Sequence, residues 1–170
     1  MTALFFVASA VAVLATILAI SRPNAVHALL YFVVSLFSAA LLFLLLGAPF
    51  VAALEVIVYA GAIIVLFLFA VMLLNLGKAS VEDEKKRLSG GIWVGPSLLA
   101  LVLAGELAWI FSTGSPEMTG AVKIGPRAIG TALYGPYVLA VELASMLLLA
   151  GLVGAYHLGR KESADGEKIR

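Results

Sequence analysis

The chain has 170 residues, of which 63% are hydrophobic and 12% are charged, and its formal net charge at pH 7 is +1. Ordinary soluble domains are about half apolar and about a quarter charged, so this composition excludes that class and indicates a membrane protein with several spans. The charged residues occupy short connecting segments instead of a basic face, which excludes nucleic acid as a partner.

The sequence contains no cysteine and two histidines, His27 and His157. Without thiolates the chain cannot hold a thiolate-bound zinc ion or an iron–sulfur cluster, and two distant histidines cannot alone bind a metal ion or haem. Each histidine falls near the end of an apolar stretch, where interfacial anchoring or helix capping is the usual role. We therefore expect this chain to bind no metal and no cofactor by itself.

Five apolar stretches are each long enough to cross a bilayer as an α-helix, because the hydrocarbon core is about 30 Å thick and a helix rises about 1.5 Å per residue. They cover residues 2–20, 25–46, 50–75, 92–111 and 136–157, and a polar tail follows over residues 158–170. The predicted fold is all-α: one polytopic membrane domain with five transmembrane helices.

Capping and helix-breaking residues mark the turns between these stretches. Asn24 is the predicted N-cap of the second span, and Pro49 stands at the start of the third, where its missing N–H would be unpaired in any case. The mixed-charge segment 77–91 must lie in water and is expected to be a loop. Residues 112–135 are rich in Gly, Ser, Thr and Pro, which predicts a second loop with a short interfacial helix near residues 128–133.

The third span carries Glu55, Tyr59 and Gly61 within an otherwise apolar sequence. Glu55 and Tyr59 are four residues apart and share one helix face, and an ionisable side chain inside a span is a candidate for proton transfer. Gly61 weakens the helix by about 1 kcal/mol relative to alanine, which favours a π-bulge or hinge. Two other interpretations stay open, since small residues also permit close helix packing and Glu55 can reach interfacial water.

Two further glutamates, Glu106 and Glu142, fall in the outer halves of the fourth and fifth spans. The predicted spans contain no lysine or arginine, so each intramembrane carboxyl must be protonated, hydrated, or paired with a hydroxyl or a neighbouring subunit. Proton transfer and simple packing against a hydroxyl, such as Ser145 beside Glu142, are both compatible with this pattern.

Lysine and arginine are distributed unevenly between the two sides of the membrane. One side receives only Lys123 and Arg127, whereas the other receives nine. The nine are Arg22, Lys78, Lys85, Lys86, Arg87, Arg160, Lys161, Lys168 and Arg170. Because cytoplasmic loops carry the excess of these residues, the side with nine is predicted to be cytoplasmic. Five spans then place the N-terminus outside and the C-terminus in the cytoplasm.

Three sequence blocks resemble one membrane-protein family. They are HALLYFVVSL, ALEVIVYAGAIIVLFLFAVMLLN and GPYVLAVELASMLLLAGLVGAYHLGR. Together they resemble the subunit J family of bacterial proton-pumping NADH:quinone oxidoreductase, respiratory complex I, whose mitochondrial counterpart is the sixth ND subunit. The resemblance extends from about Arg22 to Arg160. The charged loop and the tail share only their polar character with the family.

The resemblance implies a five-helix subunit of the membrane arm in the bacterial inner membrane, between the quinone-site subunit and the antiporter-like subunits. It implies that this chain binds no cofactor, and that NADH, FMN, iron–sulfur clusters and quinone are used in other subunits. It also implies a π-bulge near Tyr59 and Gly61 whose straightening rotates Val65 into or out of a water path. These three residues are the hinge candidates, and Glu55 is the candidate for the proton path.

Two alternative functions are also compatible with the sequence. The chain can be a purely structural subunit that seals and scaffolds other helices without gating. It can also be a free-standing small transporter, although the five spans show no internal repeat and no paired broken helices.

Overall fold

The structure is a computed structural model, and it describes residues 1–74, 91–114 and 122–159. Most of the predicted charged loop 77–91 and of the polar tail 158–170 therefore lies outside the described residues. Within the described ranges every regular element is a helix. The chain divides into two compact units, Met1–Gly125 and Pro126–Arg170.

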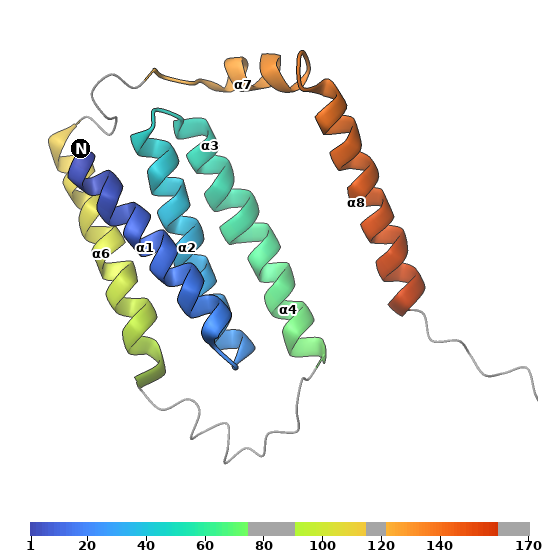
Figure 1. The fold of residues 1–170 in the computed structure, drawn as a ribbon, viewed down its shortest axis with the longest axis horizontal. Helices are drawn as coiled ribbons and strands as arrows, with labels where there is room; N and C mark the ends of the chain where they lie inside the picture. The colour runs from blue at the N-terminus through green and yellow to red at the C-terminus, as the bar shows by residue number, and fades with distance from the viewer. Residues whose placement is uncertain (75–90, 115–121, 160–170) are drawn as a thin grey trace, which may run out of the picture. The chain divides into compact units, whose positions relative to one another are not determined.

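The first unit contains four membrane-length helical segments (Figure 1). The third segment is continuous but has three parts of different backbone geometry, α3, η1 and α4. The elements are α1 (Thr2–Ser21), α2 (Ala25–Leu45), α3 (Pro49–Leu54), the π-helix η1 (Glu55–Ile63), α4 (Ile64–Leu74) and α6 (Gly91–Thr113). Helix α2 is the centre of the unit, since it packs against α1, against the third segment and against α6.

Local signals determine where these helices begin and end. The Asn24 side chain accepts a hydrogen bond of 3.1 Å from the backbone N–H of His27, which confirms the predicted N-cap of α2. At the other end of α2, Gly47 adopts a φ of 84°, a conformation that glycine adopts without steric cost. The chain thus turns within a few residues and α3 starts at Pro49, as predicted.

The core of the first unit is formed by apolar side chains between α1, α2 and α6. They are Ala8, Val11, Ala15, Val34, Leu41, Leu45, Leu103 and Ile110. Hydroxyl groups add direct bonds between α1 and α2. The buried Ser38 hydroxyl donates to the carbonyl oxygen of Ala8 at 2.6 Å, and the hydroxyls of Thr16 and Ser35 lie 2.7 Å apart. Small and hydroxyl-bearing residues of this kind permit close helix packing in membranes.

The second unit contains a short helix α7 (Pro126–Leu133) and a long apolar helix α8 (Val138–Gly159). Helix α7 separates its polar and apolar residues onto different faces, as an interfacial helix requires. Helix α8 begins at Val138, two residues beyond the predicted start, because the chain turns over residues 134–137. In this turn the N–H of Tyr137 donates to the carbonyl oxygen of Ala132 at 3.1 Å.

The described residues contain five helices that are long and apolar enough to cross a membrane. The predicted all-α class with five spans is therefore confirmed. The fourth helix extends over Gly91–Thr113, slightly beyond the predicted range 92–111. Pro96 is the sixth residue of this helix, beyond the first four N–H groups that lack an intrahelical acceptor, so it removes one intrahelical hydrogen bond near the start of the helix.

Candidate functional site

The third span departs from α-helical geometry over nine residues in its middle. Residues Glu55–Ile63 form the π-helix η1, which includes Tyr59 and Gly61. At its end the N–H of Ile64 points to the carbonyl oxygen of Tyr59, five residues earlier, and also to that of Gly61. The predicted π-bulge is confirmed, and it is longer than the single turn in which most π-bulges occur.

The absence of a side chain at Gly61 suits this widened turn. A Cβ atom at residue 61 would lie 3.3 Å from the backbone oxygen of Val56, five residues earlier, which is a tight contact. Because the contact is with backbone, a larger side chain at this residue works against the π geometry. Gly61 therefore favours η1 for a local steric reason in addition to the intrinsic flexibility of glycine.

The other candidate residues on this span differ in their exposure. Glu55 is partly buried in the first turn of η1, and no residue of η1 is fully buried. Tyr59 is 50% exposed and Val65 is 47% exposed, whereas Ile64, between η1 and Val65, is 7% exposed. Ile64 therefore lies on the packed side of α4, whereas Val65 lies on a more exposed side.

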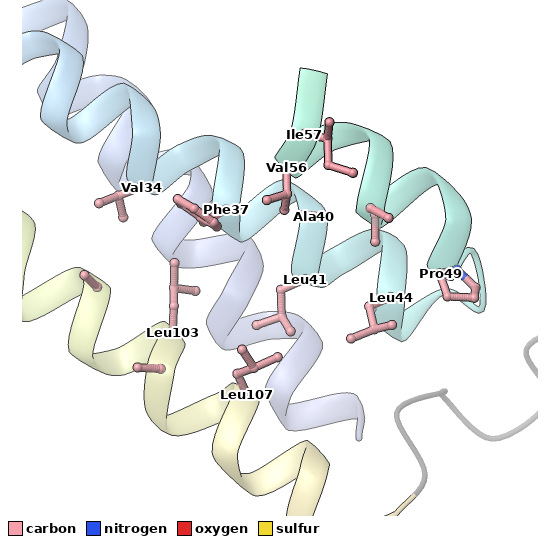
Figure 2. A pocket seen from close by; sticks show the side chains of 14 residues that line it. Val34, Phe37, Ala40, Leu41, Leu44, Pro49, Val56, Ile57, Leu103 and Leu107 are labelled. Atoms are coloured by element: carbon pink, nitrogen blue, oxygen red, sulfur yellow. The ribbon is translucent and has the colours of Figure 1, made fainter. Parts of the chain in front are cut away.

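An apolar cavity of about 670 Å³ lies beside this span. Figure 2 shows side chains of α2, of α3 with η1, and of α6 around it. Helix α2 contributes Phe37 and Leu41, η1 contributes Val56 and Ile57, and α6 contributes Leu103. The start of η1 thus forms part of the cavity wall, so a change in the π geometry alters the shape of the cavity. No sequence pattern predicted this cavity.

The three candidate glutamates lie in different environments. Glu106 on α6 is 6% exposed, and neither of its carboxyl oxygens has a hydrogen-bond partner among the described residues. Glu142 lies on α8 of the second unit and is exposed. The Ser145 hydroxyl, one possible partner of the Glu142 carboxyl, donates instead to the backbone oxygen of Glu142 at 2.7 Å.

A second cluster, which the sequence did not predict, joins α2 to α6. The ring of Tyr31 lies 5.0 Å from that of His27, and the Arg22 guanidinium lies 5.4 Å from the Tyr31 ring centre, within the range of a cation–π interaction. Tyr31 is 3% exposed and packs directly against Gly95 of α6. Among the described residues, no group of histidines and carboxylates has the arrangement of a metal site.

Comparison with known proteins assigns the chain to a family. The family described as NADH-ubiquinone/plastoquinone oxidoreductase chain 6 matches residues 15–158. The chain belongs to this family. The match contains the whole π-helical region and all the candidate residues named above.

Relatives in several bacteria have the same printed name, NADH-quinone oxidoreductase subunit J. The protein of Pseudomonas aeruginosa is 58% identical over 94% of this chain and 96% of its own length. That of Escherichia coli K12 is 48% identical over 94% of this chain and 87% of its own length. That of Rhodobacter capsulatus is 33% identical over 95% of this chain and 82% of its own length. The similarity therefore covers nearly the full length of both partners.

Proposed function

We propose that this chain is the J subunit of a bacterial proton-translocating NADH:quinone oxidoreductase. Support comes from its family and from full-length relatives that have that name. In this proposal the chain binds no cofactor, and NADH, FMN, iron–sulfur clusters and quinone are used in other subunits. Its partners are the quinone-site subunit, the antiporter-like subunits and the lipid of the cytoplasmic membrane. The N-terminus lies outside and the C-terminus lies in the cytoplasm.

The proposed role of this subunit is to couple quinone reduction to proton translocation through its third span. The observation that carries this proposal is the nine-residue π-helix in the middle of a helix that crosses the membrane. In this proposal the second geometry is an α-helix, which is intrinsically more favourable than the π-helix and becomes accessible when the packing around the segment changes. Reduction of quinone in a neighbouring subunit would change the local field and packing and so favour one of them.

The consequence of such a change is a rotation of α4 relative to α3. Conversion of the π segment to α-helix shifts the register by one residue, which corresponds to about 100° of rotation in a helix with 3.6 residues per turn. With α3 held in place, a rotation of this size moves Val65 to the direction that Leu66 now occupies and brings Ile63 to that of the buried Ile64. Movement of an apolar side chain into or out of a narrow passage wets or dries it, and this gates a water path without chemistry by the chain itself.

Glu55 is the proposed carrier of protons at this path, because it is the only ionisable carboxyl in the third span as far as the structure describes it. It is the first residue of η1, about 9 Å from the helix start at Pro49 at a rise of about 1.5 Å per residue. A register change that starts at this residue alters its surroundings and the water path together.

The test is the substitution Gly61→Val in the assembled complex. In the π geometry the valine Cβ would lie 3.3 Å from the Val56 oxygen, a tight contact, so we expect the substitution to disfavour this geometry. A bias of about 1.4 kcal/mol changes the ratio of the two forms tenfold. NADH oxidation and proton pumping, measured per assembled complex, should both fall. Gly105→Val is the matched control, because a Cβ atom at Gly105 meets nothing within 4 Å in this chain.

If the chain is a purely structural subunit, the same variant should impair assembly of the complex and not its activity per molecule. The valine would then separate packed helices and lower the amount of assembled complex, and the surviving complexes would keep normal activity per molecule. Normal specific activity together with a normal proton yield would reject the switch at Gly61. Solute transport by the isolated chain would reject both subunit proposals.

A further inference from the structure

Glu106 is a buried carboxyl residue that has no role in the proposed switch of the third span. It lies on α6 three residues after Leu103 and four before Ile110, so the three share one helix face, and all three are buried. Helix α6 packs against α1 and α2. Glu106 does not line the apolar cavity, to which α6 contributes Leu103 from the same face and Ala100, Ala104 and Leu107 from the adjoining face. The carboxyl group therefore lies in the packed core and not in the cavity.

Ser38 provides a direct comparison within the same core. Ser38 and Glu106 are the two polar residues that are buried in the described part of the chain. The Ser38 hydroxyl is satisfied by the carbonyl oxygen of Ala8, whereas both Glu106 oxygens have no partner among the described residues. Buried polar groups are almost always bonded to protein or to water. Since the oxygens of Glu106 are covered by this chain, a side chain of another subunit cannot reach them without opening the core.

The helices around Glu106 offer no counter-charge near it. Helix α1 has no charged side chain, Glu106 is the only charged side chain of α6, and the ionisable residues of α2 are His27 and Tyr31 in its first two turns. The cations at the ends of these helices are the amino group of Met1, whose side chain packs against the edge of this core, and the Arg22 guanidinium, which lies against the Tyr31 ring. An ionised carboxylate without a bonded partner is strongly disfavoured in such surroundings, and a neutral carboxylic acid is not. A neutral acid offers one O–H donor and one carbonyl acceptor, which suit a water molecule.

We propose that Glu106 is a neutral carboxylic acid that binds water inside the α1–α2–α6 core and exchanges its proton with that water during turnover. Release of the proton to water leaves the carboxylate, and return of a proton restores the acid, so the step needs no other reactant. This proton site lies on a different helix from Glu55. It goes beyond the proposed switch of the third span and does not depend on it.

The test uses the assembled oxidoreductase, purified with wild-type chain or with Glu106→Gln, Glu106→Asp or the control Glu142→Gln. Infrared spectra should show a protonated-carboxyl band that persists at alkaline pH. Glu106→Gln should abolish this band, Glu106→Asp should shift it, and Glu142→Gln, at an exposed residue, should leave it unchanged. In D₂O the band should shift faster during NADH turnover than at rest, and Glu106→Gln should lower the number of protons pumped per NADH oxidised.

Three results would overturn the proposal. They are a spectrum that Glu106→Gln does not change, a band that fails to exchange with D₂O during turnover, and a wild-type proton yield in Glu106→Gln. If glutamine impairs assembly, the band shift in Glu106→Asp, which keeps the acid, decides the assignment. A normal Gly61→Val complex beside an impaired Glu106→Gln complex would reject the switch and retain this proton site.

Discussion

The ring of Tyr31 on α2 packs directly against Gly95 on α6, so closely that a side chain at residue 95 would have to displace the end of the tyrosine ring. A Cβ atom there would collide with the Tyr31 hydroxyl oxygen and lie 3.0 Å from the ring carbon that carries it. Tyr31 is buried and is held from its other sides by His27 and Arg22. This contact fixes the approach of α6 to the central helix of the unit.

We predict that Gly95→Ala destabilises the packing of α2 against α6 by about 1–3 kcal/mol, the usual cost of overpacking. The amount of assembled complex in the membrane and its thermal stability should both fall. Tyr31→Phe removes the atom that the new methyl group meets first, so the double variant should recover part of the loss. Gly105→Ala on the same helix, with open space around it, should behave as wild type. Equal stability of the Gly95 and Gly105 variants would show that this contact does not hold the helices together.

A second prediction concerns Val65. Threonine has the shape of valine and adds a hydroxyl, so Val65→Thr changes the polarity of the proposed path with little change in volume. If rotation of Val65 dries this path, the variant should keep NADH oxidation and lose part of the pumping yield, since the closed path now admits water. The measurement is the ratio of protons pumped to NADH oxidised. Val153→Thr, at an exposed site on α8, is the control. An unchanged ratio in Val65→Thr would remove Val65 from the proposed path.

A third prediction concerns Glu55. Glu55→Gln keeps the size and most of the hydrogen-bonding capacity of the side chain and removes its ionisation. We expect a partial loss of pumping at most, because Glu55 is only partly buried near one end of its span, where water can carry the proton instead. Proton yield per assembled complex is the measurement. Complete loss with normal assembly would show that this carboxyl is indispensable to the path.

The predicted orientation can be tested with single cysteines, because the chain has none of its own. Ser21 ends α1 on the predicted cytoplasmic side, and Val122 precedes α7 on the predicted outer side, and both are exposed. An impermeant thiol reagent should label Ser21→Cys only from the cytoplasm and Val122→Cys only from outside. The opposite pattern for both variants would invert the topology. Ser80 and Ser115, in the two predicted loops, are further candidates for cysteine labelling, but they lie outside the described residues.

Local sequence determined the spans and their turns. Helix length, apolar composition, the cap at Asn24 and the proline at the start of α3 act within a few residues, and the structure agrees with each of them. The π geometry also has a local cause, since Gly61 leaves space for the wider turn. The sequence predicted its position near Tyr59 and Gly61 but not its length of nine residues.

Tertiary structure alone decided which glutamate is buried. Glu55, Glu106 and Glu142 are similar in sequence, each a single carboxyl in an apolar span, yet the first is partly buried, the second is enclosed and the third is exposed. In a soluble protein the polar face of a helix would reveal which side meets the core. In a membrane helix the side that faces lipid and the side that faces protein are both apolar, so the sequence carries little information about the packed face. For the same reason, the contact of Tyr31 with Gly95 and the cavity beside η1 could not be predicted from the sequence and are seen only in the tertiary structure.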